Sequence, residues 1–236
     1  MNSSNLNKMY LKVYNIFEAF EGEGINIGSL ETFIRLSGCP IKCATCDTPE
    51  ALDINSGYKL SIEAIARSVV KLRNRYVVIT GGEPLLQAET LHHLVRYLVN
   101  LGYYTILETS GQMYDDKVFR NVNFISADAK TPSSGINVNW TIHETMLRKY
   151  STKLQVKLVI KDRRDLKFGL RYAKWVLSKW PEMARKVIFT PCWEKGEDLD
   201  VEWVKHIHKC VKRLHLPVRV IPQVHKIIYG SMSRDV

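Results

Sequence analysis

The chain has 236 residues, of which 45% are hydrophobic and 25% are charged. This composition is typical of a folded globular protein and excludes a collagenous, fibrous or mostly disordered chain. No apolar run approaches the roughly 18 residues that would span a bilayer. The first residues lack the apolar stretch of a secretory signal, so we expect a cytoplasmic protein with no membrane association.

The formal net charge of +10, from 34 Lys and Arg against 24 Asp and Glu, raises the local concentration of anionic partners. The basic residues do not form one block but are spread through helix-like segments. We therefore expect dispersed surface charge and no requirement for nucleic acid. There is no low-complexity linker, so we predict one domain over residues 1–236, with about ten N-terminal and six C-terminal residues flexible.

Short β-rich segments alternate with segments of helical period along the chain. Ser61 begins a predicted helix as its N-cap, and that helix runs to about Arg73. The next helix carries Leu91, Leu94 and Leu98 on one face and ends at Gly102. Further helices are predicted at 141–150, 165–180 and 198–214. Strands are predicted at 12–18, 30–36, 76–80, 103–108, 122–128, 154–160, 186–190 and 217–221.

Strands separated by helices indicate parallel βαβ units, as in a closed or partial (β/α) barrel or a doubly wound sheet. In both architectures the functional groups lie at the carboxyl ends of the strands. Polar, Gly-rich or ligand-type residues follow five of the predicted strands: Cys39–Cys46, Gly81–Pro84, Glu108–Gly111, Asp128–Gly135 and Gln223–Lys226. We therefore expect one site at that edge of the sheet.

Three of the five cysteines lie within eight residues, at Cys39, Cys43 and Cys46. One such loop suits an iron–sulfur cluster, whose irons are held by thiolates. Three cysteines on four irons would leave one iron open to a ligand. The alternative is a zinc site completed by Cys192, Cys210 or a histidine, but the chain offers no second pair of closely spaced ligands.

The C-x3-C-x2-C spacing is the signature of radical S-adenosylmethionine (SAM) enzymes, and Gly81-Gly82-Glu83-Pro84 resembles their second motif. Further segments narrow the resemblance to the 7-carboxy-7-deazaguanine synthase family: Glu21-Gly22-Glu23-Gly24, Arg35, Cys46-Asp47-Thr48, Glu108-Thr109-Ser110-Gly111, Pro132–Gly135 and Gln223–Gly230. The resemblance covers about residues 14–230.

This resemblance implies a partial (β/α)6-type barrel, trimmed or modified. It implies a lyase that converts 6-carboxy-5,6,7,8-tetrahydropterin into 7-carboxy-7-deazaguanine with loss of ammonia, on the route to 7-cyano-7-deazaguanine, queuosine or archaeosine. The implied cofactors are a 4Fe–4S cluster, SAM and Mg2+. The implied partners are a flavodoxin- or ferredoxin-type electron donor and a second copy of the chain in a homodimer.

The resemblance also implies the site. Cys39, Cys43 and Cys46 would hold the cluster, and Thr48 would bind Mg2+. Glu21 stands where the family commonly has Gln, and an ionised Glu lacks the donor that Gln provides. The implied substrate-binding residues are Phe20, Glu21, Gly22, Glu23, Arg35, Asp47, Thr80 and His225. The implied SAM-binding residues are Gly82, Glu83, Glu108, Ser110, Asp128, Ala129, Lys130, Lys157, Thr190, Pro191, Cys192 and Trp193.

Two other functions remain open at this stage. One is another radical SAM enzyme, either a glycyl-radical activase or a tRNA-modifying enzyme that uses the positive charge. The other is a non-enzymatic zinc module that binds nucleic acid. Iron–sulfur absorption and a strong salt dependence of RNA binding would separate these readings.

Overall fold

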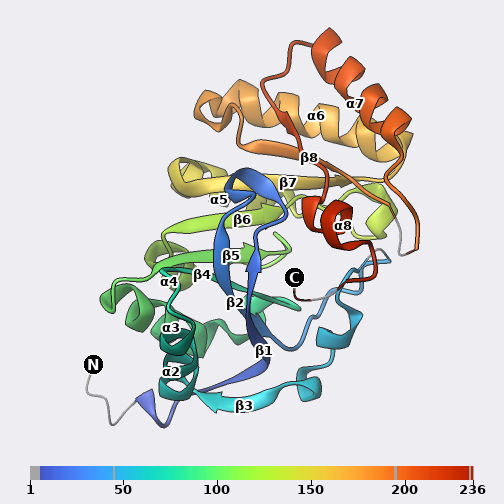
Figure 1. Cartoon of the computed structure of the whole chain (residues 1–236). Helices are drawn as coiled ribbons and strands as arrows, with labels where there is room; N and C mark the ends of the chain where they lie inside the picture. The colour runs from blue at the N-terminus through green and yellow to red at the C-terminus, as the bar shows by residue number, and fades with distance from the viewer. Residues whose placement is uncertain (1–5, 45, 194–195, 234, 236) are drawn as a thin grey trace.

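A computed structural model describes residues 6–44, 46–193, 196–233 and 235 (Figure 1). Its strands form one nine-stranded sheet in the order β3-β1-β2-β4-β5-β6-β7-β8-β9. Strands β2 and β4 to β9 run parallel to one another, whereas β1 pairs antiparallel with both β2 and β3. The sheet does not close, so the expectation of a partial barrel is confirmed.

The strands are β1 (Tyr10–Phe20), β2 (Leu30–Leu36), β3 (Tyr58–Ser61), β4 (Tyr76–Gly81), β5 (Tyr104–Thr109), β6 (Phe124–Asp128), β7 (Leu154–Ile160), β8 (Val187–Pro191) and β9 (Arg219–Val220). The α-helices are α2 (Ile62–Leu72), α3 (Ala88–Asn100), α4 (Asp116–Asn121), α5 (Trp140–Tyr150), α6 (Arg163–Lys179), α7 (Val201–Arg213) and α8 (Val224–Tyr229).

Most predicted elements are present, with shifted ends. Ser61 is the N-cap of α2, and its side chain accepts a hydrogen bond from the Ala64 backbone N–H. The predictions missed β3, α4 and α8, which are four to six residues long. Elements this short carry too few residues for a periodic pattern. Of the ends predicted to be flexible, residues 1–5, 234 and 236 lie outside the described residues.

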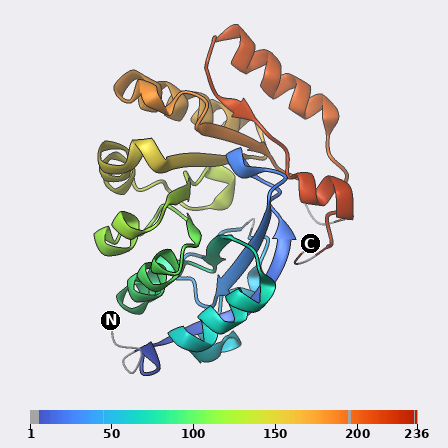
Figure 2. The ribbon, with the colours of Figure 1, turned by 60° about the vertical axis from the view of Figure 1, so that its left-hand side comes forward.

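Alternate residues of each strand face opposite sides of the sheet. One side packs against the helices, and it carries the main apolar core, including the fully buried Ile34, Ile79, Leu107 and Ile125. In Figure 2 the helices coloured green to orange lie along this side, whereas α8, in red, lies on the other. The helix-covered side therefore holds the fold together.

The inner side of the sheet changes character along the strands. Near their amino ends, Phe33, Val78, Ile106 and Phe124 lie in register and form a small apolar cluster. Closer to the carboxyl ends, the same side carries Arg35, Thr80, Glu108, Ser126 and Lys157. The apolar cluster is thus the base of the inner side, and the polar residues point into the open end.

Candidate active site

A cavity of about 300 Å3 lies at the carboxyl ends of the parallel strands. This is the edge at which the sequence predicted a site. Among the lining residues are the following predicted ones: Phe20, Glu21, Gly22, Glu23, Arg35, Cys39, Cys43, Cys46, Asp47, Thr48, Thr80, Gly82, Glu108, Ser110, Asp128, Ala129, Lys130, Lys157, Cys192 and His225. Glu83, Thr190, Pro191 and Trp193 do not line it.

The three clustered cysteines all open onto this cavity. Burial raises the pKa of all three thiols, and the charge of Cys43 adds to this rise at Cys39 and Cys46. Ligands of a single zinc ion would converge within roughly 2.3 Å of it, and no described His, Cys, Asp or Glu side chains form such a group. Cysteines that bind different irons of one cluster stand farther apart, so the loop suits a cluster better than one ion.

The cysteine loop rests on the Gly-rich turn that follows β4. The Glu83 backbone N–H donates to the Gly38 carbonyl over 2.9 Å, and the Gly82 N–H donates to the Leu36 carbonyl over 2.9 Å. A side chain at position 82 would meet the Gly38 carbonyl oxygen at 2.4 Å and the Cys39 Cβ at 2.9 Å. Glycine is therefore required for the turn to support the cysteines this closely.

Glu83 is fully buried beneath the cavity rather than exposed in it. Burial raises the pKa of its carboxyl group, while hydrogen bonds from Ser110 and from the Leu85 N–H lower it. Both Thr109 and Ser110 donate their hydroxyl protons to this carboxylate. Glu83 thus connects the turn after β4 to the loop after β5, and its carboxylate holds that loop in place by accepting these hydrogen bonds.

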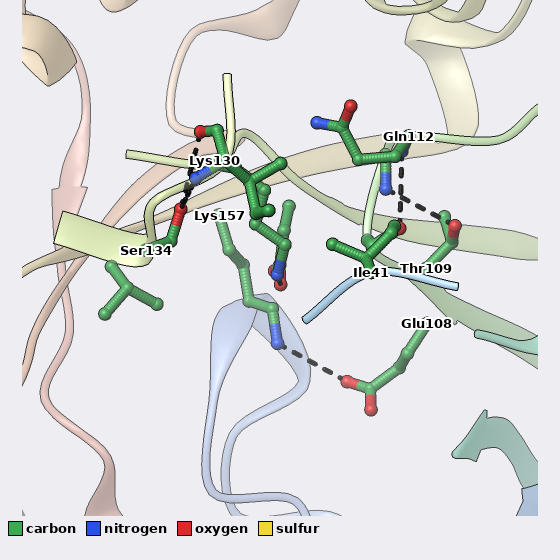
Figure 3. Close-up of polar contacts among 12 residues, drawn as sticks. Ile41, Glu108, Thr109, Gln112, Lys130, Ser134 and Lys157 are labelled. Carbon is green, nitrogen blue, oxygen red and sulfur yellow. Dashed lines mark hydrogen bonds and ion pairs between the residues drawn. The ribbon is translucent and has the colours of Figure 1, made fainter. Parts of the chain in front are cut away.

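Lys157 of β7 reaches two carboxylates from other elements. Its Nζ lies 2.8 Å from Glu23 Oε2 and 3.5 Å from Glu108 Oε1; Figure 3 shows Lys157 and Glu108 pointing toward each other. Burial by itself would raise the pKa of Glu23, but the charge and hydrogen bond of Lys157 lower it to about 2. Burial likewise opposes the charge of Lys157, yet the surrounding carboxylates raise its pKa well above the ordinary value. Glu23 and Lys157 therefore form a buried ion pair.

Glu21 lies beside this pair without a cation of its own among the described residues. Its Oε1 accepts a hydrogen bond from the Glu23 backbone N–H over 2.9 Å. Burial, followed by the charge of Glu108, raises its pKa well above the ordinary value. Glu31 lies deeper on the inner side and does not line the cavity; burial raises its pKa to about 7. The pKa values of Glu21 and Glu23, two residues apart, are therefore shifted in opposite directions.

Arg35 holds the part of the cavity next to the cysteine loop. Its Nη1 donates to the Thr48 hydroxyl over 3.2 Å, and that hydroxyl lies 3.2 Å from Asp47 Oδ1. Its Nη2 lies 3.2 Å from Asp235 Oδ1 near the C-terminus. The guanidinium also lies over the Phe17 ring, 5.2 Å from the ring centre. A cation placed in this way can bind a carboxylate.

The loop after β6 contributes a second ion pair. Lys130 Nζ lies 2.7 Å from Asp128 Oδ2. Burial lowers the pKa of Lys130, but Asp128 and Cys43 raise it above the ordinary value. The intervening Ala129 is fixed by its N–H, which donates to the Lys157 carbonyl over 2.8 Å. This loop therefore presents a positive charge near the cysteines.

Helix α8 closes the cavity from the C-terminal side. The His225 ring packs directly on Gly22, where an added Cβ would lie 2.0 Å from Nδ1. Burial lowers the pKa of His225, which favours its neutral form. Gln223 Nε2 donates to Glu23 Oε1 over 2.6 Å. The segment Glu21–Glu23 is thus held between β7 and α8.

The segment after β8 is only partly in the cavity. Thr190 and Pro191 are buried in strand β8, and Trp193 is buried with Lys226 over its ring. Of the four predicted residues, only Cys192 lines the cavity. The assignment of all four to SAM remains a prediction.

Sequence reasoning missed several lining residues, among them Thr109, Ser126, Gln223 and Asp235. Ser126 could have been found from strand alternation, because it lies two residues before Asp128 on β6. Gln223 was noticed only as part of a motif. No sequence signal pointed to Asp235, which follows 200 residues after its partner Arg35.

Comparisons with known proteins agree with this geometry. Residues 20–127 match a family model described as a 4Fe-4S single cluster domain. The chain resembles QueE from Escherichia coli with a TM-score of 0.68 and 20% identity, covering 95% of this chain and 99% of that one. It also resembles SuiB from Streptococcus suis, solved with S-adenosylmethionine, with a TM-score of 0.53 and 13% identity, covering 78% of this chain and 45% of that one. The open parallel sheet with a three-cysteine loop at its mouth thus defines a radical SAM iron–sulfur protein.

Curated relatives identify the family within that class. The chain is 31% identical to 7-carboxy-7-deazaguanine synthase from Methanospirillum hungatei, over 92% of this chain and 85% of that protein. It is 30% identical to the synthase from Thermoplasma acidophilum, over 93% and 98%, and 33% identical to that from Aquifex aeolicus, over 89% and 90%. The chain belongs to the 7-carboxy-7-deazaguanine synthase family, as the sequence motifs predicted.

No helix among the described residues is long and apolar enough to cross a membrane.

Proposed function

We propose that this chain is a radical SAM lyase that converts 6-carboxy-5,6,7,8-tetrahydropterin into 7-carboxy-7-deazaguanine with loss of ammonia, for 7-deazapurine biosynthesis. The observation that carries the proposal is a single cavity that joins a three-cysteine loop to buried carboxylates and an arginine. Family membership supplies the reaction. The glycyl-radical activase and the tRNA-modifying enzyme have no comparable support.

The cysteine loop would hold the cluster, and SAM would bind beside it. When bound, these cofactors would supply radical chemistry for hydrogen abstraction from the substrate. The protein provides position and excludes water. Gly82 would let the backbone approach SAM closely, and the loops at Glu108–Ser110 and Asp128–Lys130 would contact its amino acid and ribose parts.

The substrate would lie against the segment Phe20–Glu23, with Thr80, Asp47 and His225 around it. Arg35 would bind the carboxylate that substrate and product share, because a guanidinium offers paired donors to a carboxylate. Glu23, ionised beside Lys157, would accept hydrogen bonds from the N–H groups of the heterocycle. These roles follow from placement and charge, and each is part of the proposal.

Thr48 would bind Mg2+ through its hydroxyl, since Mg2+ prefers oxygen and shares its coordination with substrate and water. In support, Thr48 lines the cavity beside Arg35 and Asp47. A flavodoxin- or ferredoxin-type donor would deliver the electron, and two chains would form a homodimer in the cytoplasm. Binding of nucleic acid is not required.

The test is turnover by the anaerobically reconstituted protein with the tetrahydropterin, SAM and dithionite. We expect 7-carboxy-7-deazaguanine, identified by mass spectrometry, and faster turnover with Mg2+. Protein that holds an intact cluster and cleaves SAM but yields no ring-contracted product would contradict the family's reaction here. Equal rates with Mg2+ and with a chelator would contradict only the metal assignment.

A further inference from the structure

Resting on the proposed function, we infer that Glu21 binds the substrate as a neutral carboxylic acid. It donates a hydrogen bond to a ring carbonyl oxygen and accepts one from the neighbouring ring N–H. The target is therefore a lactam edge, in which a carbonyl and an N–H stand side by side. Glu23, two residues along, is ionised and only accepts.

The first support is the balance of charge around Glu21. Its charged neighbours are Glu23 from the same segment, Glu108 of β5, Glu31 of β2 and Lys157 of β7. Lys157 Nζ is already within 2.8 Å of Glu23 and 3.5 Å of Glu108. Two further charged or titratable groups act on these neighbours rather than on Glu21: His225 faces Glu23, and Asp128 faces Lys157. One ammonium group therefore serves several carboxyl groups, and Glu21 has no ion-pair partner among the described residues.

The second support is the pattern of hydrogen bonds. Glu23 receives donors on both oxygens, from Lys157 and from Gln223 Nε2. Glu21 receives a single backbone N–H on Oε1, although only 9% of the residue is exposed. A buried carboxylate with one donor and no cation is costly, whereas a carboxylic acid there is not. The upward shift in the pKa of Glu21 agrees with this geometry.

The consequence concerns what the site can recognise. A neutral carboxyl group has one donor and one acceptor side by side, which matches a lactam in both positions. An ionised carboxyl group in the same place would repel the lactam oxygen. The product named for this family is a deazaguanine, whose six-membered ring carries such an edge. An ionised Glu21 would offer acceptors only and would favour the amino analogue, which presents a donor where the lactam presents the carbonyl.

The first experiment reads the protonation state directly. An infrared difference spectrum between the reconstituted wild type and Glu21→Gln at neutral pH is expected to show a protonated carboxyl stretch in the wild type. Glu23→Gln provides the control, since Glu23 is ionised beside Lys157 and its removal should take away no acid band. A carboxylate band in place of the acid band for Glu21 would overturn the inference.

The second experiment reads recognition through the binding of 7-carboxy-7-deazaguanine to the SAM-loaded protein, measured by calorimetry. On going from about pH 6 to about pH 9, the affinity of the wild type should fall by roughly tenfold more than that of Glu21→Gln, because only the wild type can lose a proton at position 21. Any titration of the product itself affects both proteins equally, so it cancels in the ratio of wild-type affinity to Glu21→Gln affinity. Glu21→Ala should weaken binding at pH 6 by roughly 10- to 100-fold, because the lactam loses both partners.

Three outcomes would overturn the inference: a ratio that does not change with pH, Glu21→Gln as weak as Glu21→Ala at pH 6, or no binding by the wild type. Failure of the proposed function is read separately, as lack of turnover by a wild type that binds the product normally. The two proposals can therefore fail independently.

Discussion

The two sides of the same strands differ in kind. On β5, Leu107 faces the helices in a fully apolar setting, while the next residue, Glu108, faces the cavity and Lys157. On β2, Ile34 and Arg35 divide in the same way. The helix side is close-packed and contributes stability, whereas the cavity side collects charges that are costly to bury. Substitutions at two neighbouring residues of one strand should therefore have different effects: one should lower stability and the other should lower activity.

The largest effect is expected at the cysteine loop. Cys43→Ala should remove the cluster, its visible absorption and all turnover, because the two remaining thiolates are too few to bind a 4Fe–4S cluster. The free energy of unfolding of the cluster-free protein should change by less than about 1 kcal/mol, since Cys43 is not part of the apolar core. Cys210→Ala on α7 is the control and should keep the cluster. Turnover by Cys43→Ala would refute the site.

Lys157→Met should reduce both activity and stability, because it leaves Glu23 and Glu108 without their cation. Removing one partner of a buried pair costs about 3–5 kcal/mol. The low pKa of Glu23, about 2, means that the pair contributes stability above an ordinary Glu pKa of about 4.3. That contribution is lost as the pH falls toward 2. The deficit of Lys157→Met in chemical denaturation should therefore be larger at pH 7 than at pH 3; an equal deficit at both would show that the ion pair contributes little.

Leu107→Ala should lower stability and leave turnover unchanged, the opposite of what is expected for a residue that lines the active-site cavity. It opens a void in the helix-side core and should cost about 2–5 kcal/mol of unfolding free energy. Turnover per folded molecule should stay near that of the wild type, because the side chain does not reach the cavity. Glu108→Gln, one residue later, should lower turnover with a much smaller loss of stability. If both variants lost turnover equally, the division between the two sides would not hold.

Much of the division between these sides could be predicted from the sequence, and the reasons are physical. Strand alternation and the cysteine spacing are local patterns, so β2, β4 and β5 and their trailing loops were found. Long-range contacts carry no local signal: neither the ion pair of Arg35 with Asp235 nor the hydrogen bond of Gln223 with Glu23 has one. Protonation is also a property of the assembled site. Glu21 looks like an acceptor in the sequence, and only its buried neighbours indicate otherwise.

Glu31 offers a test of the inner side below the cavity. Burial raises its pKa to about 7, so the folded state holds a proton that the unfolded state releases near pH 4.3. Its contribution to stability is therefore greatest at low pH and is lost as the pH rises through about 7. Glu31→Gln should gain at most about 3 kcal/mol over the wild type at pH 8, with little difference at pH 4. Thermal unfolding at the two pH values measures this, and an equal gain at both would contradict it.

The smallest effect is expected at Asp235, whose side-chain carboxylate forms an ion pair with Arg35. Its Oδ1 lies 3.2 Å from Arg35 Nη2, and its Oδ2 accepts from Asn15 Nδ2 over 2.6 Å. Because the Asp235 side chain is partly exposed, the pair is worth at most about 1 kcal/mol. Asp235→Asn frees Arg35 for the substrate carboxylate and should lower KM by about two- to fivefold, the range that such an energy allows, with kcat unchanged. A higher KM would show instead that Asp235 helps to hold the substrate once it is bound.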